Sequence, residues 1–295
     1  MSWSDYFTDT SFEHMHNDHS FIGLGDSLEL LKNTRSASVD LIFADPPYNI
    51  GKDFGGVKDK WESKGEYLDW CKCWIDECFR VLKDDGSFYF MNATQFIPYL
   101  DVYVQENYNV LSRIVWSYDS SGVQSKRMFG SLYEPILLTN KSSKATYTFN
   151  AQDILVDAKT GSERQLIDYR KDPPQPYNTK KVPGNVWEIP RVRFKMEEYE
   201  NHPTQKPESL LERIILASSN KGDIVLDPFG GSFSTAATAI KLGRKAISFE
   251  IEPAYYKIGI RRTEIAHEYK GEALQKDKSR KTRNLSKKDR GQHQI

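Results

Sequence analysis

The stretch Val39-Asp40-Leu41-Ile42-Phe43-Ala44-Asp45-Pro46-Pro47-Tyr48 is an apolar run of strand-forming residues that stops at an acid and two prolines. It predicts a buried strand over residues 39–44, because proline removes a backbone donor and ends a strand. In an open α/β sheet, ligands bind beyond the carboxyl ends of the strands. The acid and the aromatic ring that follow this strand are therefore expected to face a ligand.

Strands and helices alternate on both sides of this stretch. The spacing of apolar residues predicts helices over residues 65–83, 208–219 and 234–242, and strands over residues 87–91, 224–226 and 245–250. This alternation favours an α/β fold with a mostly parallel sheet. Between residues 118 and 200, prolines cluster and the periodicity fades, which indicates an irregular insert.

Composition narrows the class of protein. The 295 residues include 41 basic and 41 acidic side chains, and 13% are aromatic. Such aromatic content excludes bulk disorder, and no run approaches the roughly 18 apolar residues of a membrane span. The first 20 residues lack the features of a signal peptide, and three clustered cysteines are too few for a disulfide framework. We therefore expect a cytoplasmic protein.

The zero net charge hides two basic regions. Residues 271–295 carry eight basic side chains against three acidic ones, and residues 159–195 carry nine against four. A local positive patch can attract a polyanion even when the whole protein is neutral. For the tail alone, a solvated, flexible segment explains the charges equally well.

The residues after the 39–44 strand suit one chemical problem. The exocyclic amine of adenine or cytosine is a poor nucleophile, because its lone pair is delocalised into the ring. The Asp45 carboxylate and the Pro46 carbonyl can each accept one amine hydrogen, which localises that lone pair toward an electrophile. Tyr48 offers a flat face for stacking. The same residues, taken alone, also fit an ordinary strand-to-turn junction.

A second motif, Asp227-Pro228-Phe229-Gly230-Gly231-Ser232, follows the 224–226 strand and precedes a helix. Its glycines let the backbone approach a ligand closely, and Glu250, at the end of the next strand, can hold ribose hydroxyls. Together they indicate a nucleoside-containing ligand, although neither common phosphate-binding glycine motif is present. Upstream, Asp26 can accept from an adenine amino group or cap a helix over residues 27–32.

The motif order Asp-Pro-Pro-Tyr, then His-Pro-Thr-Gln-Lys-Pro at 202–207, then Asp-Pro-Phe-Gly-Gly-Ser resembles the β group of DNA amino-methyltransferases over about residues 20–285. These enzymes use S-adenosylmethionine to methylate N6 of adenine or N4 of cytosine. The resemblance implies a Rossmann-like methyltransferase fold with a circularly permuted motif order. It also implies a catalytic and cofactor-binding domain (20–117 and 200–270) and a target-recognition insert (118–199). The charge and low apolar content of residues 271–295 predict a basic, flexible tail.

The resemblance assigns roles to individual residues. The catalytic set is Asp45, Pro46, Pro47 and Tyr48. The cofactor-binding set is Asp26, Asp45, Thr204, Lys206, Asp227, Phe229, Gly231, Ser232 and Glu250. If the insert recognises the target, its basic side chains are the candidates for DNA binding: Lys126, Arg127, Arg164, Arg170, Lys180, Arg191 and Arg193. Phe233 departs from the family pattern, which often has a second glycine there, and is expected to narrow the loop and weaken cofactor affinity.

An Asp at the first position of the catalytic motif is typical of adenine-N6 enzymes. The expected reaction is therefore methylation of N6 of an adenine flipped out of duplex DNA. Cytosine-N4 methylation and a sequence-specific DNA-binding regulator with an inactive site are the alternatives. The resemblance suggests a short palindrome containing adenine as the target, with ATGCAT as a guess, and dimers are common in this group. No metal is expected, because the histidines at 14, 16 and 19 lack a nearby thiolate or second cluster.

Overall fold

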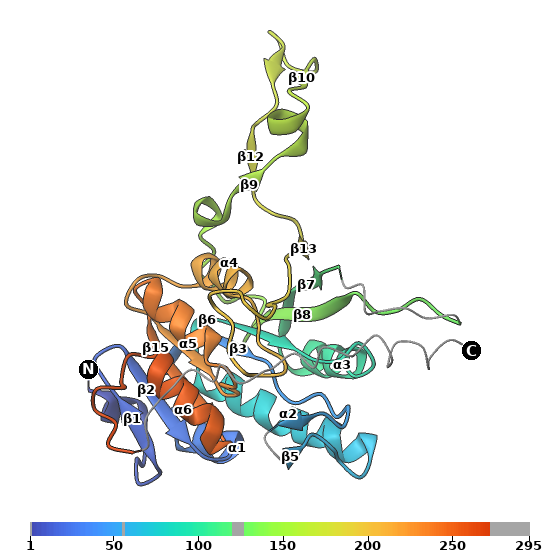
Figure 1. Ribbon diagram of the computed structural model, residues 1–295. Coiled ribbons are helices and arrows are strands. Elements are labelled where there is room, and N and C mark those ends of the chain that lie inside the picture. The colour runs from blue at the N-terminus through green and yellow to red at the C-terminus, as the bar shows by residue number, and fades with distance from the viewer. Residues whose placement is uncertain (1, 55–56, 120–126, 272–295) are drawn as a thin grey trace, which may run out of the picture.

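A nine-stranded mixed sheet forms the centre of the computed structural model, which describes residues 2–54, 57–119 and 127–271 (Figure 1). The strand order is β1-β2-β15-β14-β3-β6-β8-β7-β13. Five neighbouring strands are parallel: β2 (Ser20–Leu24), β15 (Lys245–Glu250), β14 (Ile224–Asp227), β3 (Val39–Ala44) and β6 (Leu82–Met91). At one edge, β1 (His14–His16) pairs antiparallel with β2. The expected α/β class is confirmed.

The other half of the sheet contains strands from the region interpreted as an insert. Strand β8 (Tyr133–Asn140) lies antiparallel between β6 and β7 (Asn109–Ser117), and β13 (Val186–Glu188) pairs parallel with β7. The apolar side chains of residues 136–138 are buried and hold β8 in the sheet. The segment that leaves the sheet is therefore shorter than the 118–199 boundary suggested.

Helices cover both faces of the sheet and give it two core clusters. One face carries α1 (Ser27–Asn33), α2 (Lys64–Val81) and α3 (Ile97–Asn107), and the other carries α4 (Glu208–Ser218), α5 (Ser234–Lys241) and α6 (Pro253–Arg262). The helices predicted from apolar spacing correspond to α2, α4 and α5, with ends that differ by at most two residues. Each of these helices buries one apolar face against the sheet, which is why the spacing of apolar residues predicted it correctly.

An arm, defined here as residues 156–181, projects from the body (Figure 1). At its base, β9 (Val156–Asp157) pairs antiparallel with β12 (Lys180–Lys181), and farther out β10 (Ile167–Asp168) pairs with β11 (Gln175–Pro176). A helical turn η3 (Lys159–Glu163) lies between β9 and β10. A Cβ on Gly161 would fall 2.1 Å from the Asn178 carbonyl oxygen, so the two sides of the arm are closely packed.

Shorter elements complete the description: η1 (Trp3–Tyr6), η2 (Ala151–Ile154), β4 (Asp53–Phe54) and β5 (Val57–Lys58). Within the described ranges, no helix is long and apolar enough to cross a membrane, and no group of three His, Cys, Asp or Glu residues could hold a metal ion. The predicted DNA contact Lys126 lies outside the described residues, as does the basic tail apart from its first residue.

Candidate active site

Four acidic side chains stand at the carboxyl ends of four neighbouring parallel strands. Asp26 follows β2, Glu250 ends β15, Asp227 ends β14 and Asp45 follows β3. Because these strands are adjacent, the four side chains form a row. They line a cavity of about 340 Å³ together with the loop containing residues 202–206. The side chain of Asp26 also caps α1, as expected for one of its two roles.

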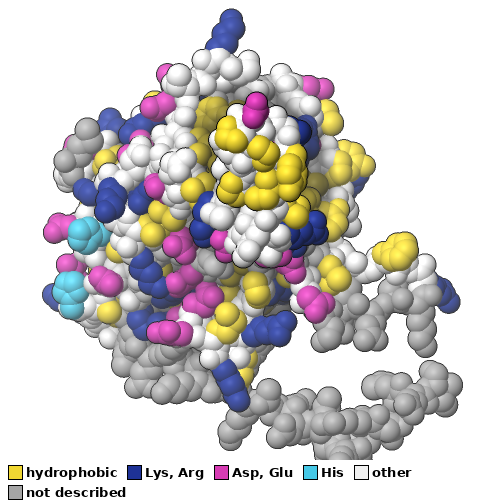
Figure 2. All heavy atoms as spheres, turned by 90° about the horizontal axis from the view of Figure 1, so that it is seen from above, with side chains coloured by type: hydrophobic (Ala, Val, Ile, Leu, Met, Phe, Trp, Pro, Cys, Tyr) yellow, Lys and Arg dark blue, Asp and Glu magenta, His cyan; other side chains and the backbone are white. Residues whose placement is uncertain are grey.

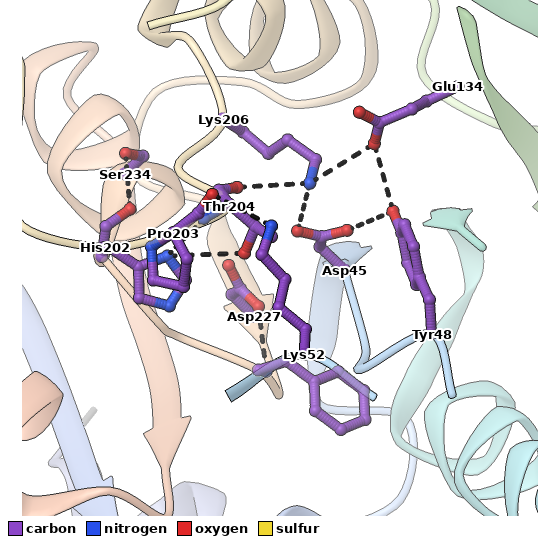
Figure 3. Close-up of polar contacts among 12 residues, drawn as sticks. Asp45, Tyr48, Lys52, Glu134, His202, Pro203, Thr204, Lys206, Asp227 and Ser234 are labelled. Atoms are coloured by element: carbon purple, nitrogen blue, oxygen red, sulfur yellow. Dashed lines mark hydrogen bonds and ion pairs between the residues drawn. The ribbon is translucent and has the colours of Figure 1, made fainter. Parts of the chain in front are cut away.

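Asp45 is held from two sides. Its Oδ1 accepts a hydrogen bond from the Tyr48 hydroxyl at 2.5 Å, and its Oδ2 accepts one from the Lys206 ammonium at 2.5 Å (Figure 3). Burial raises the pKa of Asp45, an effect that the charge of Lys206 opposes. The Pro47 carbonyl accepts from the Tyr67 hydroxyl, whereas the Pro46 carbonyl has no hydrogen-bond donor within the described residues. Pro46 therefore keeps an acceptor for an incoming donor.

The loop after Tyr48 is fastened by a buried carboxylate that the sequence analysis missed. Asp59 accepts the backbone amides of Tyr48 at 3.1 Å and Ile50 at 3.4 Å, and also the amide of Lys52. Asn49 takes a left-handed conformation with φ +54°, which Asn tolerates better than most residues. These contacts fix the position of the Tyr48 ring.

Glu250 organises the glycine loop that follows β14. Its Oε2 accepts the amide of Gly231 at 2.7 Å, and its Oε1 accepts the amides of Ile251 at 3.0 Å and Glu252 at 2.8 Å. Gly231 has φ +52°, and a Cβ there would lie 3.0 Å from the His202 ring. Both the backbone conformation and the space therefore require glycine.

Burial shifts two titratable groups in this cavity in opposite directions. It raises the pKa of Asp227 to about 7, although the carboxylate accepts the Phe229 amide at 3.0 Å. Burial, with the nearby charges of Lys206 and Lys52, lowers the pKa of His202 to about 3. At neutral pH the His202 ring is thus uncharged, and the carboxylate of Asp227 is costly to ionise without a cationic partner.

Phe233 does not narrow the cavity, whereas its expected effect on cofactor affinity stays a prediction. It takes a left-handed conformation with φ +55°, which explains why glycine is favoured at this position. Its ring is fully buried and lies against Gly259 of α6, where an added Cβ would be 2.6 Å from the ring. The residue is not part of the cavity lining. The ring therefore supports the loop from beneath instead of narrowing the cavity.

A second cavity of about 240 Å³ adjoins the first, and the two share the lining residues Tyr48, Ile50, Lys52, Thr204 and Lys206. Among its other lining residues are the aromatic side chains Trp116, Tyr118 and Tyr133 and the carboxylate Glu134. Glu134 lies on β8, and its Oε1 accepts from the Tyr118 hydroxyl at 3.3 Å. Sequence reasoning missed Glu134, because the adjacent Pro135 and the irregular region around it concealed the strand.

The structure distributes the remaining predicted residues over three places. Thr204, Phe229 and Ser232 line the first cavity. Arg191 lines the second, with its guanidinium 4.9 Å from the Tyr118 ring. The other described members of the DNA-binding set are exposed: Arg164, Arg170 and Lys180 on the arm, and Arg127 and Arg193 outside it.

Comparisons with known proteins agree with this geometry. The DNA methylase family model, N6_N4_Mtase, matches residues 39–261. DNA adenine methyltransferase YhdJ from Escherichia coli (strain K12) is 60% identical over 274 residues, which cover 93% of this chain and 92% of the relative. The crystal structure of the M1.HpyAVI-SAM complex superposes with a TM-score of 0.55 at 26% identity, covering 82% of this chain and 98% of that one. The PvuII DNA methyltransferase (cytosine-N4-specific) has a TM-score of 0.63 at 21% identity, covering 85% and 90%.

The mixed sheet has two adjoining cavities at its carboxyl edge, and a row of acids lines the first of them. With the comparisons above, this is the fold and site of a methyltransferase; the chain belongs to the DNA methylase family. The expected fold class, enzyme class and cofactor, S-adenosylmethionine, are confirmed by these comparisons. The roles of the individual site residues stay predictions.

Proposed function

We propose that this protein transfers a methyl group to N6 of an adenine flipped out of duplex DNA, at a specific sequence. The observation that carries the proposal is the position of Asp45, which lines the first cavity beside the wall shared with the second. An amine at this junction can donate one hydrogen to Asp45 and the other to the Pro46 carbonyl. Both acceptors make its lone pair available for attack.

The residues of the first cavity fit S-adenosylmethionine. The backbone at Gly231 leaves a cradle that a Cβ would fill, and the Asp227 carboxylate is buried at one side of it. Glu250 Oε2 accepts only one amide and can also accept a ribose hydroxyl, and Asp26 is the nearby acid for an adenine ring. When bound, this cofactor supplies an electrophilic methyl group on a positively charged sulfur.

The chain's own contribution is positioning and the exclusion of water. Tyr48 lies at the wall of the second cavity, where its face can stack on a flipped base, and its hydroxyl is fixed on Asp45. Once methylated, the amine nitrogen is strongly acidic and loses a proton. Asp45 is the adjacent carboxylate, and burial raises its pKa, so it is placed either to receive that proton or to pass it to water.

DNA contact is assigned to the arm and to the residues around the second cavity. From above, the arm ends in exposed apolar side chains, and both basic and acidic side chains lie around it (Figure 2). The exposed apolar residues of the tip include Leu166, Ile167 and Tyr169. The expected phosphate contacts among the described residues are Arg127, Arg164, Arg170, Lys180, Arg191 and Arg193. The family resemblance adds the expectation of a homodimer, and DNA binding adds that of association with the nucleoid.

Cytosine-N4 methylation is the alternative that has a specific observation in its favour. The PvuII structure, whose name includes that specificity, shares the fold, and a second cavity of about 240 Å³ is large enough for either base. Adenine is preferred for two reasons. The relative that is 60% identical is a DNA adenine methyltransferase, and the catalytic motif begins with Asp instead of Ser.

The test is methyl transfer from labelled S-adenosylmethionine into unmethylated genomic DNA, followed by nucleoside mass spectrometry. Asp45→Ala is assayed beside the wild type and beside Asp18→Asn, a change at an exposed surface position. We expect N6-methyladenine from the wild type and the control only, with cofactor binding retained by both of them. N4-methylcytosine would establish the alternative. No methylated base, with cofactor binding intact, would favour the regulator. Sequencing of the methylated DNA then shows whether ATGCAT is the target.

A further inference from the structure

Lys206 lies between two carboxylates and is bonded to only one of them. Its ammonium is 2.5 Å from Asp45 Oδ2 and 3.6 Å from Glu134 Oε2 (Figure 3). The three side chains are only 8%, 15% and 18% exposed, in the order Lys206, Asp45 and Glu134. The nearby carboxylates outweigh the effect of burial and raise the pKa of Lys206, so the ammonium stays charged.

Both groups that donate to Asp45 have Glu134 as a second acceptor. Tyr48 donates to Asp45 Oδ1 at 2.5 Å, and the same hydroxyl is 3.4 Å from Glu134 Oε2. Lys206 donates to Asp45 Oδ2 and faces Glu134 at the longer distance. Asp45 therefore uses both oxygens for protein donors in this structure. An incoming amine competes with those donors for the carboxylate.

Glu134 is fixed where a donor that leaves Asp45 can reach it. Its backbone is held in β8 between β6 and β7, directly opposite Trp116. Its other oxygen, Oε1, accepts from the Tyr118 hydroxyl at 3.3 Å. A buried ammonium without a partner is strongly unfavourable. Release of Lys206 from Asp45 therefore requires another carboxylate at short range.

We infer that Glu134 is a positioning residue for the methyl transfer: it takes over the Lys206 ammonium when the target amine engages Asp45. The inference rests on the proposed function, because it assigns Asp45 to the amine of the base. Glu134 does not touch the reacting atoms in this scheme. It acts through Lys206, and it keeps the ammonium paired in both arrangements.

Glu134→Gln is the direct test. The amide keeps the volume of the side chain and an oxygen for Tyr118, but it removes the charge that attracts Lys206. We expect the single-turnover rate of methylation to fall about 100-fold, since an ion pair is replaced by a neutral contact in a buried site. The Kd values for S-adenosylmethionine and for duplex DNA should change less than about twofold. Glu188→Gln, at an exposed position on β13, is the matched control.

A double-mutant cycle with Lys206→Met separates this role from a purely structural one. If Glu134 acts through Lys206, adding Glu134→Gln to Lys206→Met should slow methylation by less than about twofold. A structural role would instead reduce the rate by the same factor in both backgrounds. Thermal melting and cofactor titration of each variant establish that it is folded.

The outcomes distinguish failure of the inference from failure of the proposed function. If the wild type makes no N6-methyladenine, the proposed function fails. If the wild type is active and Glu134→Gln is as fast as Glu188→Gln, the inference fails while the function stands. Equal losses from Glu134→Gln with and without Lys206 would also overturn the inference. A large loss that disappears in the Lys206→Met background supports it.

Discussion

The backbone amide of Gly231 donates a 2.7 Å hydrogen bond to the Glu250 carboxylate, which ties the glycine loop after β14 to the end of β15. Two further amides, of Ile251 and Glu252, donate to the other oxygen. Glu250→Gln replaces one acceptor oxygen by a donor. We expect the Kd for S-adenosylmethionine to rise at least about tenfold, because hydrogen bonds to a charged acceptor contribute about 1.5–3 kcal/mol. Isothermal titration calorimetry measures this change.

Glu106→Gln, at the exposed end of α3, controls for the loss of a carboxylate in general. Equal cofactor affinity in the Glu250 variant and this control would contradict a role for Glu250 in shaping the loop.

The contact between Phe233 and Gly259 predicts a loss of stability in Gly259→Ala. The new Cβ would lie 2.6 Å from the Phe233 ring, which has no free space to enter because it is fully buried. We expect the free energy of unfolding to fall by about 1–3 kcal/mol, as for other overpacked cores. Urea denaturation measures it.

Two further variants test whether the loss of stability comes from the contact between Phe233 and Gly259. Gly184→Ala has nothing within 4 Å of the new Cβ and should leave stability nearly unchanged. Phe233→Leu, combined with Gly259→Ala, should recover part of the loss because the smaller side chain relieves the clash. If Gly259→Ala is as stable as Gly184→Ala, the packing argument is wrong.

Asp227 predicts a pH-dependent stability. Burial raises its pKa from the usual 3.8 to about 7, so the folded protein binds this proton more tightly than the unfolded chain. The contribution of Asp227 to stability is therefore fully present below about pH 4, decreases as the pH rises toward 7, and is lost above it. Asp227→Asn removes the buried charge while keeping an oxygen for the Phe229 amide.

The expected result for Asp227→Asn is a melting temperature several degrees above that of the wild type at pH 8, and a smaller difference at pH 5. Calorimetry without cofactor at both pH values gives the comparison, with Asp18→Asn as the exposed control. A difference that is independent of pH would exclude Asp227 as the titrating group.

The contacts of Asp59 predict that Asp59→Asn lowers activity, because they fix the loop after Tyr48. Its carboxylate accepts three backbone amides, and Asp59→Asn presents amide hydrogens to some of them. The loop should then hold Tyr48 less firmly, and we expect kcat to fall about tenfold or more. Steady-state methylation assays measure kcat, with Asp69→Asn on the exposed side of α2 as the control. Unchanged kcat in Asp59→Asn would show that the loop needs no such anchor.

The arm predicts a salt-dependent effect on DNA binding. Arg164→Ala should weaken binding to duplex DNA and reduce the slope of log K against log salt by about one, since one phosphate contact is lost. Arg170→Ala should have a smaller effect, because Asp168 holds that guanidinium through two hydrogen bonds of 2.8 and 3.0 Å. Fluorescence anisotropy at several salt concentrations tests both, with Lys221→Ala on the surface of the body as the control. A common slope for all three would remove the arm from the DNA interface.

Strands β3, β14 and β15, and the acids at their ends, were predictable because the signals are local. A short apolar run that ends in an acid identifies both the strand and the end that carries the ligand, and in β3 and β14 a proline directly after the acid marks that end as well. The adjacency of Asp45, Asp227 and Glu250 then follows from the parallel sheet. The family resemblance added Thr204 and Lys206, which lie in an irregular loop.

Glu134 and Asp59 could not be predicted in the same way. Glu134 reaches the site because β8 pairs with β6 and β7, and such pairing depends on partners that are distant in the sequence. Pro135 lies within β8, and a proline normally argues against predicting a central strand, because it cannot donate a hydrogen bond to a neighbouring strand. Asp59 accepts hydrogen bonds from backbone amides, and because every residue except proline has such an amide, the sequence does not indicate which ones it contacts. The conformation of Phe233 likewise depends on the space provided by Gly259.

The ladder at the base of the arm has an evolutionary consequence. Val156 pairs with Lys181, so the chain returns to the body beside the point where it left. The segment between them is contiguous in the gene, and it contains none of the residues in the two cavities. One recombination event can therefore replace it whole. Under the proposed assignment, a lineage could acquire a new DNA target in this way while inheriting its chemistry intact.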